Sequence, residues 1–457
     1  MMLIRIILGL LGLGVVVFVH ELGHFLAARL MGIGVEAFSI GWGKPIFKKK
    51  IGEVEYRLGI FPLGGYCKMK GDGDYEEVYN KSKEGIKAEE GSYFAAHPFR
   101  RIVACLAGPL FNFIFAVIVF AVIWGVGFEV NTLGNRIILA SEVIPESHNP
   151  SDEAGLMTGD RIVSIMGRDT ETFNDIQEII AINPGEYLPM VVDRDGEHLG
   201  LTVRPVMDRS TGAGRIGVYF WTDPVIGSVA SEGPAYNAGL TDGDRILSIN
   251  NTEVPHTIAL ITLLENMPET LNIEYYREGR TYWTVLVPEY GDNGAVNLGI
   301  SWEAVTYQNP RLWPHQAIIK GISETWRTFS ISVRSLSLLF SGIDISQAVS
   351  GPIRITYLVG DVAAEGFSQG IGTGLSAMAG FLALISIALC MMNLLPLPIL
   401  DGGMIIMFIA EGIWRRPLHP RLVSVFQTLG IVIIAGLMFF AIFGDIRYLA
   451  NIIGRSN

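Results

Sequence analysis

The chain has 457 residues, of which 50% are hydrophobic and 17% are charged, and its mean hydropathy is +0.39. This composition is too apolar for an ordinary soluble protein and indicates a membrane protein. The net charge of -11 excludes the basic surface that binds nucleic acid, so we expect no nucleic-acid partner.

Four windows satisfy or approach the requirement of about 20 apolar residues for a membrane-spanning helix. They cover residues 6–28, 102–127, 367–400 and 422–443. Arg5 before the first window would also suit a cleavable signal peptide. The run continues through His20, Glu21 and His24 without a small-residue cleavage pattern, so we expect this segment to stay in the mature protein.

The first window contains the sequence HELGH, which has the HExxH pattern, at residues 20–24. On a helix, His20 and His24 lie one turn apart on the same face, and Glu21 lies beside that face. Two imidazoles can hold one Zn²⁺, and a neighbouring carboxylate can deprotonate a water molecule at the metal. Ionisable groups at membrane depth are costly, so their presence here predicts a catalytic metal site.

Charge is distributed unevenly along the chain. Residues 44–101 contain 12 Lys or Arg against 9 Asp or Glu, whereas residues 129–370 contain 15 against 31. The positive-inside rule therefore predicts a cytoplasmic loop after the first span, with the long acidic region and both termini outside. The three cysteines, Cys67, Cys105 and Cys390, lie outside the acidic region, which excludes a disulfide framework there.

The acidic region contains an internal repeat. AGLMTGDRIVSIMG at residues 154–167 recurs as AGLTDGDRILSINN at residues 238–251, an offset of 84 residues. Each copy predicts short strands and one helix, near residues 173–182 and 256–265. This pattern resembles PDZ domains, which commonly bind peptide ends by adding a strand. A tandem that only spaces or guards the membrane part is an equal alternative.

Apolar residues at helical spacing follow, with scattered charges. We expect one or two amphipathic helices at the outer membrane face within residues 309–366.

The third window ends in NLLPLPILDGG, residues 393–403. A catalytic zinc usually has three protein ligands, and Asp401 is the candidate for the third. An Asp-Gly turn leaving the membrane is the alternative reading. The predicted topology brings both groups to the same depth, so His20, His24 and Asp401 can converge on one zinc ion per chain. Asn393, Pro396 and Pro398 would lie beside them.

The chain resembles the site-2 protease family of intramembrane zinc metalloproteases in four features. These are HExxH, AGPLFN at residues 107–112, the tandem repeat and NLLPLPILDGG. The resemblance implies that Glu21 is the general base and that Asn393 contacts the substrate backbone. It also implies that residues 39–44 and 56–69 form a membrane-reentrant β-loop whose edge strand pairs with substrate; that strand would present Gly64, Gly65 and Tyr66. Asn112 either bridges helices or takes part in gating and substrate unwinding.

The expected fold is a polytopic α-helical membrane protein with about four spans, a membrane-reentrant β-loop and two tandem periplasmic PDZ domains of α+β type. The expected segments are 1–128 (membrane half), 129–220 and 221–308 (PDZ domains), 309–366 (amphipathic helices) and 367–457 (membrane half).

The expected function is intramembrane cleavage of single-span proteins in the bacterial inner membrane, with the PDZ pair filtering substrates by size. An anti-sigma factor and remnant signal peptides are the substrates that the family implies. A membrane-anchored PDZ scaffold that binds peptide C-termini and has a non-catalytic zinc site is the alternative. A zinc transporter is less favoured because no repeat of spans is visible.

Overall fold

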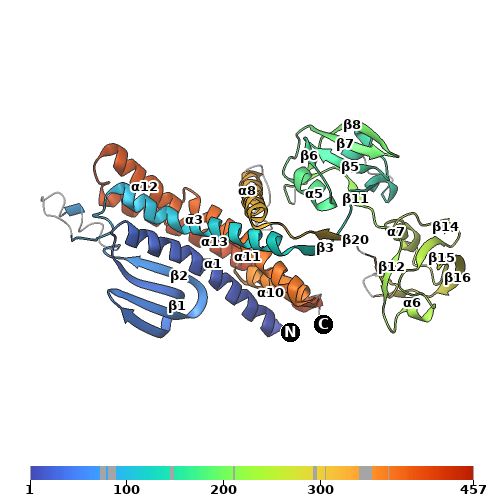
Figure 1. Cartoon of the computed structure of the whole chain (residues 1–457), viewed down its shortest axis with the longest axis horizontal. Helices are drawn as coiled ribbons and strands as arrows, with labels where there is room; N and C mark the ends of the chain where they lie inside the picture. The colour runs from blue at the N-terminus through green and yellow to red at the C-terminus, as the bar shows by residue number, and fades with distance from the viewer. Residues whose placement is uncertain are drawn as a thin grey trace. The chain divides into compact units, whose positions relative to one another are not determined.

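The computed structural model describes residues 2–72, 79–80, 89–144, 149–208, 211–291, 296–303, 305–338, 352–368 and 370–455. These residues form two compact units (Figure 1). One unit combines the chain up to residue 128 with the described residues from 309 onward, and the other is residues 129–308. The predicted segment 309–366 therefore belongs to the helical unit; its residues 339–351 lie outside the described part of the chain.

The first unit is built from helices. They are α1 (Met2–Leu30), α3 (Pro98–Val126), α8 (Pro314–Leu338), α10 (Pro352–Ser368), α11 (Ile371–Leu394), α12 (Asp401–Trp414) and α13 (Pro420–Arg455). Four helices in the described residues are long and apolar enough to cross a membrane, and they match the four predicted windows. They comprise Ile7–Leu30, Pro98–Val126, Ile371–Leu394 and Pro420–Ile446.

The third predicted window is too long. Its helix, α11, ends at Leu394, because Pro396 and Pro398 follow and neither can donate a helical hydrogen bond. A separate helix that the sequence reasoning missed, α12, then begins at Asp401. Asp401 is thus the first residue of a new helix, where a carboxylate interacts favourably with the helix dipole.

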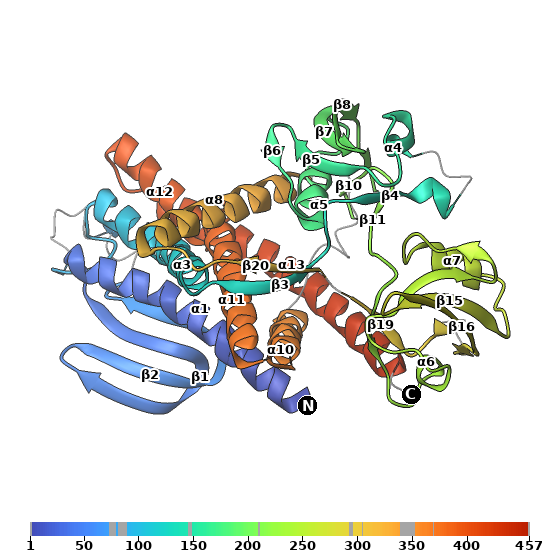
Figure 2. The same cartoon turned by 45° about the vertical axis from the view of Figure 1, so that its right-hand side comes forward.

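Strands β1 (Val35–Ile51) and β2 (Val54–Met69) form an antiparallel pair beside α1, and both curve strongly (Figures 1 and 2). Residues 37–40 of β1 have partners on two sides, at 65–68 and at 55–58. Phe38 packs edge-on against Phe25 of α1, with ring centroids 5.3 Å apart. The far part of the pair exposes large apolar side chains, among them Trp42, Ile46, Phe47, Ile60 and Phe61.

Helix α8 packs along α3, and its expected position at the outer membrane face stays a prediction. Ala317 lies near Gly125, Gly321 lies against the backbone at Val117 and Ala121, and the ring of Phe329 is 6.1 Å from that of Phe113. The two helices therefore run in opposite directions. Close approach depends on Gly321, since a Cβ there would lie 2.8 Å from the Ala121 nitrogen.

The second unit contains two lobes with the same strand order. Their four-stranded sheets have the orders β6-β5-β7-β8 and β14-β13-β15-β16. The strands of the first sheet are β5 (Arg161–Ile165), β6 (Arg168–Asp169), β7 (Leu188–Arg194) and β8 (Glu197–Val203). Those of the second are β13 (Arg245–Ile249), β14 (Thr252–Glu253), β15 (Leu271–Arg277) and β16 (Arg280–Leu286).

Short strands and helices complete the lobes. The helical segments are η1 (Ala140–Glu142), α4 (Pro150–Glu153), α5 (Phe173–Ala181), α6 (Pro234–Asn237) and α7 (Ala259–Leu264). Two-stranded pairs join β4 (Ile137–Leu139) to β11 (Val218–Phe220), β12 (Ile226–Val229) to β19 (Ile300–Trp302), β9 (Val206–Met207) to β10 (Gly214–Arg215), β17 (Glu289–Tyr290) to β18 (Val296–Asn297), and β3 (Phe128–Thr132) to β20 (Val305–Asn309).

The repeat extends to an ion pair between a partly exposed arginine and a buried aspartate. Arg194 contacts Asp160 at 2.7 Å and donates to the Gly155 carbonyl, while Arg277 contacts Asp244 at 2.6 Å and donates to the Gly239 carbonyl. Each Asp follows a Gly in the repeated GDR sequence. Of the predicted helices, α5 matches its expected range and α7 is shorter. The assignment of both lobes to the PDZ fold stays a prediction.

Candidate metal centre

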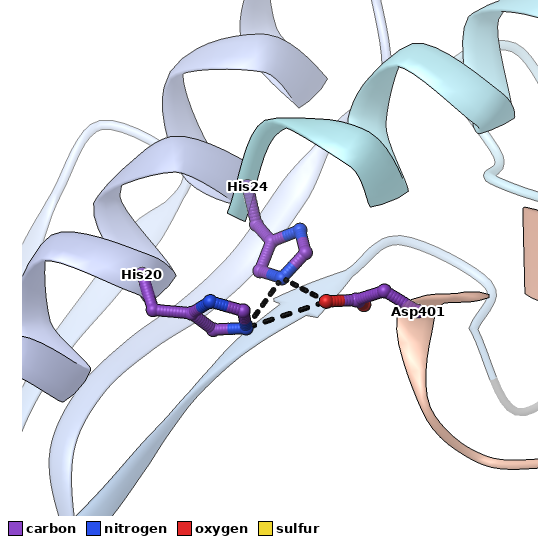
Figure 3. A group of neighbouring side chains, drawn as sticks. All are labelled: His20, His24 and Asp401. Carbon is purple, nitrogen blue, oxygen red and sulfur yellow. Dashed lines mark hydrogen bonds and ion pairs between the residues drawn. The ribbon is translucent and has the colours of Figure 1, made fainter. Parts of the chain in front are cut away.

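Two elements distant in sequence bring three ligand atoms together. His20 and His24 project from successive turns of α1 toward Asp401 at the start of α12 (Figure 3). The two Nε2 atoms are 3.2 Å apart, and each lies 3.4 Å from Oδ2 of Asp401. Both imidazoles are buried, with 7% and 8% of their residues' surface exposed.

These separations fit a metal ion. A tetrahedral zinc with bonds of about 2.0–2.1 Å holds its ligand atoms roughly 3.3–3.4 Å apart. Among the residues that the structure describes, Oδ2 of Asp401 is buried without a hydrogen-bond partner, as expected of an atom reserved for a cation. Among the described residues, His20, His24 and Asp401 form the group whose ligand atoms could hold a metal.

Helix α3 orients His24. The Nδ1 atom lies 2.8 Å from the Ala104 carbonyl oxygen and donates to it, which leaves the lone pair of Nε2 for a metal. Gly108, one turn farther along α3, lies directly against both rings. A Cβ at Gly108 would lie 2.8 Å from Cε1 of His20 and would contact Nε2 of His24 even more closely. A side chain at residue 108 would therefore fill the metal site.

Asn112 contacts the other imidazole. Its side-chain amide lies 3.2 Å from Nδ1 of His20, and its backbone carbonyl accepts from the Ser386 hydroxyl of α11 at 3.0 Å. Oδ1 of Asn112 is buried and has no hydrogen-bond partner within the described ranges of the chain. The oxygen and nitrogen of a side-chain amide are told apart only by their hydrogen bonds. Turning the Asn112 amide by half a turn therefore places Oδ1 against Nδ1 of His20 and gives this oxygen a partner. Oδ1 then accepts from Nδ1–H of His20, and Nε2 is again free for a metal.

Glu21 lies between the ligands and β2. It interacts electrostatically with His20, His24 and Asp401, and the backbone of Cys67 contacts its carboxylate. Gly65 of β2 faces the same side chain, since a Cβ there would lie 3.1 Å from Cγ of Glu21. A carboxylate beside three ligand atoms has the arrangement required of a general base for a water molecule at the metal.

The structure brings only part of the predicted substrate site to the metal centre. The Asn393 side chain donates to the Leu389 carbonyl of its own helix at 3.1 Å. Pro398 is buried against Gly430, whereas Pro396 is exposed. On β2, Gly64 packs against Trp42, and the Tyr66 hydroxyl accepts from Arg57 at 2.9 Å. Gly65, between Gly64 and Tyr66 on β2, is the predicted substrate-site residue that lies against Glu21.

Cys67 lies beside Glu21 but does not belong to the group of ligand atoms found among the described residues. Burial, reinforced by the negative charges of Glu21 and Asp72, raises the pKa of Cys67 to about 12. A neutral thiol is neither a good zinc ligand nor a good nucleophile. The site therefore offers a set of nitrogen and oxygen ligands with a carboxylate base.

Ala104 and Gly108 contact the histidines, which the sequence reasoning did not predict, since it expected only close packing or a kink at Gly108. Their signal is a stripe of small and polar residues, Ala104, Gly108 and Asn112, at intervals of four on an apolar helix. All three are buried and face α1. Such a stripe is typical of close helix packing in membranes, and here it also holds the metal ligands.

Comparisons with known proteins agree with this chemistry. The model of peptidase family M50 matches residues 8–437. A Treponema pallidum protein named "Putative zinc metalloprotease" is 37% identical over 98% of this chain and 100% of its own length. The regulator of sigma E protease of Haemophilus influenzae is 29% identical over 95% of this chain and 97% of its own. RseP of Escherichia coli is 28% identical, with the same coverage.

One solved structure is similar to a small part of the chain. The PDZ domain of an SdrC-like protein from Listeria monocytogenes is 19% identical, with a TM-score of 0.16. The match covers 19% of this chain and 93% of that one. Because identity and TM-score are both low, this likeness does not by itself establish the fold of either lobe.

Proposed function

The chain belongs to peptidase family M50, the site-2 proteases, and from this premise we propose that it cleaves peptide bonds within the membrane at the site of His20, His24 and Asp401. It is a multi-pass zinc metalloprotease. One zinc ion per chain is the proposed stoichiometry. The observation that carries the proposal is the convergence of three ligand atoms, 3.2–3.4 Å apart, beside Glu21.

The proposed roles follow from the contacts. His20, His24 and Asp401 hold zinc, which when bound polarises the scissile carbonyl and lowers the pKa of a water molecule. Glu21 takes the proton from the attacking water and passes it to the departing amine. Ala104 and Asn112 hold the imidazole tautomers, so Asn112 is proposed as a positioning residue rather than a gate.

We propose that β2 presents the substrate. A membrane helix hides its carbonyls in its own hydrogen bonds and must be unwound before water can attack. The end of β2 that contains Gly64, Gly65 and Tyr66 is paired with β1 on one side, while Gly65 faces Glu21. Strand addition at this edge would replace the bonds lost on unwinding. Asn393, Pro396 and Pro398 are proposed to border the same substrate path.

The proposed substrates are single-span membrane proteins in a bacterial inner membrane, of the anti-sigma-factor type or remnant signal peptides. The acidic unit and both termini would face the periplasm, in agreement with the charge asymmetry of the sequence. We propose that this unit consists of two PDZ domains that exclude substrates with bulky exterior domains. Binding of peptide C-termini by the lobes would be an additional way to select substrates.

The test compares the native chain with Glu21→Gln in detergent, using a single-span substrate without an exterior domain. We expect zinc binding in both chains and a loss of cleavage of roughly 10²–10⁴-fold in the variant, the usual contribution of a general base. Zinc content by atomic absorption and product by mass spectrometry are the two measurements. If both chains bind zinc and neither cleaves any of several substrates, the PDZ scaffold with a non-catalytic zinc site becomes the better explanation.

A further inference from the structure

A buried ion pair connects α3 to α12 away from the metal ligands. Nη2 of Arg101 lies 2.7 Å from Oε2 of Glu411, and the two side chains are only 5% and 2% exposed. The Arg101 guanidinium also lies over the ring of Phe408, 4.4 Å from its centroid. Oε1 of Glu411 accepts from the backbone nitrogen of Leu418 at 3.1 Å. We refer to Arg101 and Glu411 as the clamp.

The clamp is not explained by stability alone. Removing two charges from water costs about as much free energy as their attraction returns, so apolar side chains of similar size would stabilise the contact at least as well. Nε and Nη1 of Arg101 are, in addition, buried without partners in the described part of the chain. The best-attested use of such a pair is to fix the register of two packed elements.

The clamp shares a helix face with the residues that orient the histidines. Arg101, Ala104, Gly108 and Asn112 are spaced by three, four and four residues, which places them along one side of α3. Ala104, Gly108 and Asn112 contact His24 and His20. Arg101 instead contacts α12, the helix whose first residue is Asp401. One face of α3 thus touches both elements that supply the metal ligands.

We infer that Arg101 and Glu411 are positioning residues that fix the rotation and axial position of α12 on α3, so that Oδ2 of Asp401 meets the two histidines. A helix held only by apolar contacts can rotate or slide by a fraction of a turn with little change in buried area. The directional contact between Arg101 and Glu411 removes that freedom at the opposite end of α12. The inference rests on the proposed ligand set.

The test measures zinc affinity of the full chain in detergent by competition with a chromophoric chelator. We expect Glu411→Gln to raise the Kd for zinc by roughly 10–100-fold, the usual cost of losing an outer support of a metal site. Glu411→Gln keeps an oxygen for the Leu418 nitrogen and so isolates the charge. Because the clamp acts through Asp401, the double variant Glu411→Gln/Asp401→Asn should bind zinc no more weakly than Asp401→Asn alone.

Two further variants separate positioning from folding. Arg101→Met/Glu411→Met leaves no buried charge unpaired and loses only the acceptor of the Leu418 nitrogen, so it should still fold yet bind zinc more weakly. Arg194→Met breaks a similar pair in the other unit and should leave the Kd unchanged. The absorption spectrum of the Co²⁺-loaded Glu411→Gln chain should shift in the same direction as that of Asp401→Asn.

Each outcome decides the question. The clamp is rejected if Glu411→Gln and the double Met variant bind zinc as tightly as the native chain while Asp401→Asn does not. Losses from Glu411→Gln and Asp401→Asn that add together would also reject it, because general loosening, unlike positioning, acts independently of Asp401. If Asp401→Asn itself keeps native affinity, the proposed ligand set fails, and the clamp inference fails with it.

Discussion

Asn112 shows how a single side chain in an apolar helix can be assigned by its contacts. It is fully buried, and its amide faces Nδ1 of His20, while its backbone carbonyl bonds to Ser386. The sequence left two readings open, a bridge between helices and a gate. The contacts favour a third one, in which the amide oxygen fixes the tautomer of a metal ligand.

This assignment predicts that Asn112→Leu weakens zinc binding by roughly 10–100-fold, because Nδ1 of His20 loses the acceptor that orients its ring. Asn112→Asp keeps an acceptor at the same position and should bind zinc nearly as tightly as the native chain. Ser386→Ala is the matched control, since it removes the bond to α11 without touching His20. Zinc competition titrations of the four chains check the prediction. Weakening by Ser386→Ala equal to that by Asn112→Leu would instead support the helix bridge.

At the scale of elements, β2 and α1 approach each other closely at Gly65 and Glu21. A Cβ on residue 65 would lie 3.1 Å from Cγ of Glu21 and 2.8 Å from the Ser39 carbonyl oxygen. Of the metal ligands, Asp401 lies on α12, and the two histidines of α1 contact α3. A small change at residue 65 should therefore displace the base without displacing the ligands.

We accordingly predict that Gly65→Ala retains zinc affinity but lowers kcat by up to about 100-fold, since misplacing a catalytic group by about 1 Å can cost that much. Gly436→Ala in α13, where a Cβ would meet open space, is the control and should leave both quantities unchanged. Cleavage kinetics on a single-span substrate, together with zinc titration, separate the two effects. A parallel loss of zinc affinity would show that residue 65 supports the whole site instead.

Most elements could be predicted from the sequence because their signals are local. Apolar length predicted four spans, HExxH predicted two ligands on one helical face, and the repeat predicted two lobes of equal topology. Helix α12 was missed because the residues after Asp401 continue an apolar run with no further charge before Glu411, so hydropathy alone did not separate α12 from α11. The contact of Arg101 with Glu411 joins residues 310 positions apart, and no local pattern predicts such a pair.

At the scale of the whole molecule, the second unit contains a buried histidine, His256, whose protonation can affect the stability of that unit. Burial lowers the pKa of His256, and the charge of Glu142, 3.6 Å away, only partly offsets this effect. Arg136 lowers the pKa further, and the Trp221 ring lies edge-on at 4.8 Å. Nδ1 of His256 accepts from the Ala259 nitrogen at the start of α7, a bond that a proton on Nδ1 would break.

The sign of the resulting pH dependence follows from proton linkage. Below about pH 6.5 the unfolded chain binds a proton at this histidine, whereas the folded unit resists protonation until a lower pH. The stability of the second unit is therefore complete above about pH 6.5 and should decrease as the pH falls through the window down to the folded pKa.

Hydrogen exchange of residues 245–286 in the full chain, corrected for intrinsic rates, measures this local stability between neutral and mildly acidic pH. We expect protection to fall with pH in the native chain and to vary less in His256→Gln, whose side chain does not titrate. His198→Gln, which changes an exposed histidine on β8, should behave like the native chain. A native profile in His256→Gln would assign the pH dependence to the carboxylates of the unit. A smaller pH dependence of protection in His256→Gln would mean that acidification destabilises the second unit through His256. This effect would arise outside the unit that contains the proposed zinc ligands.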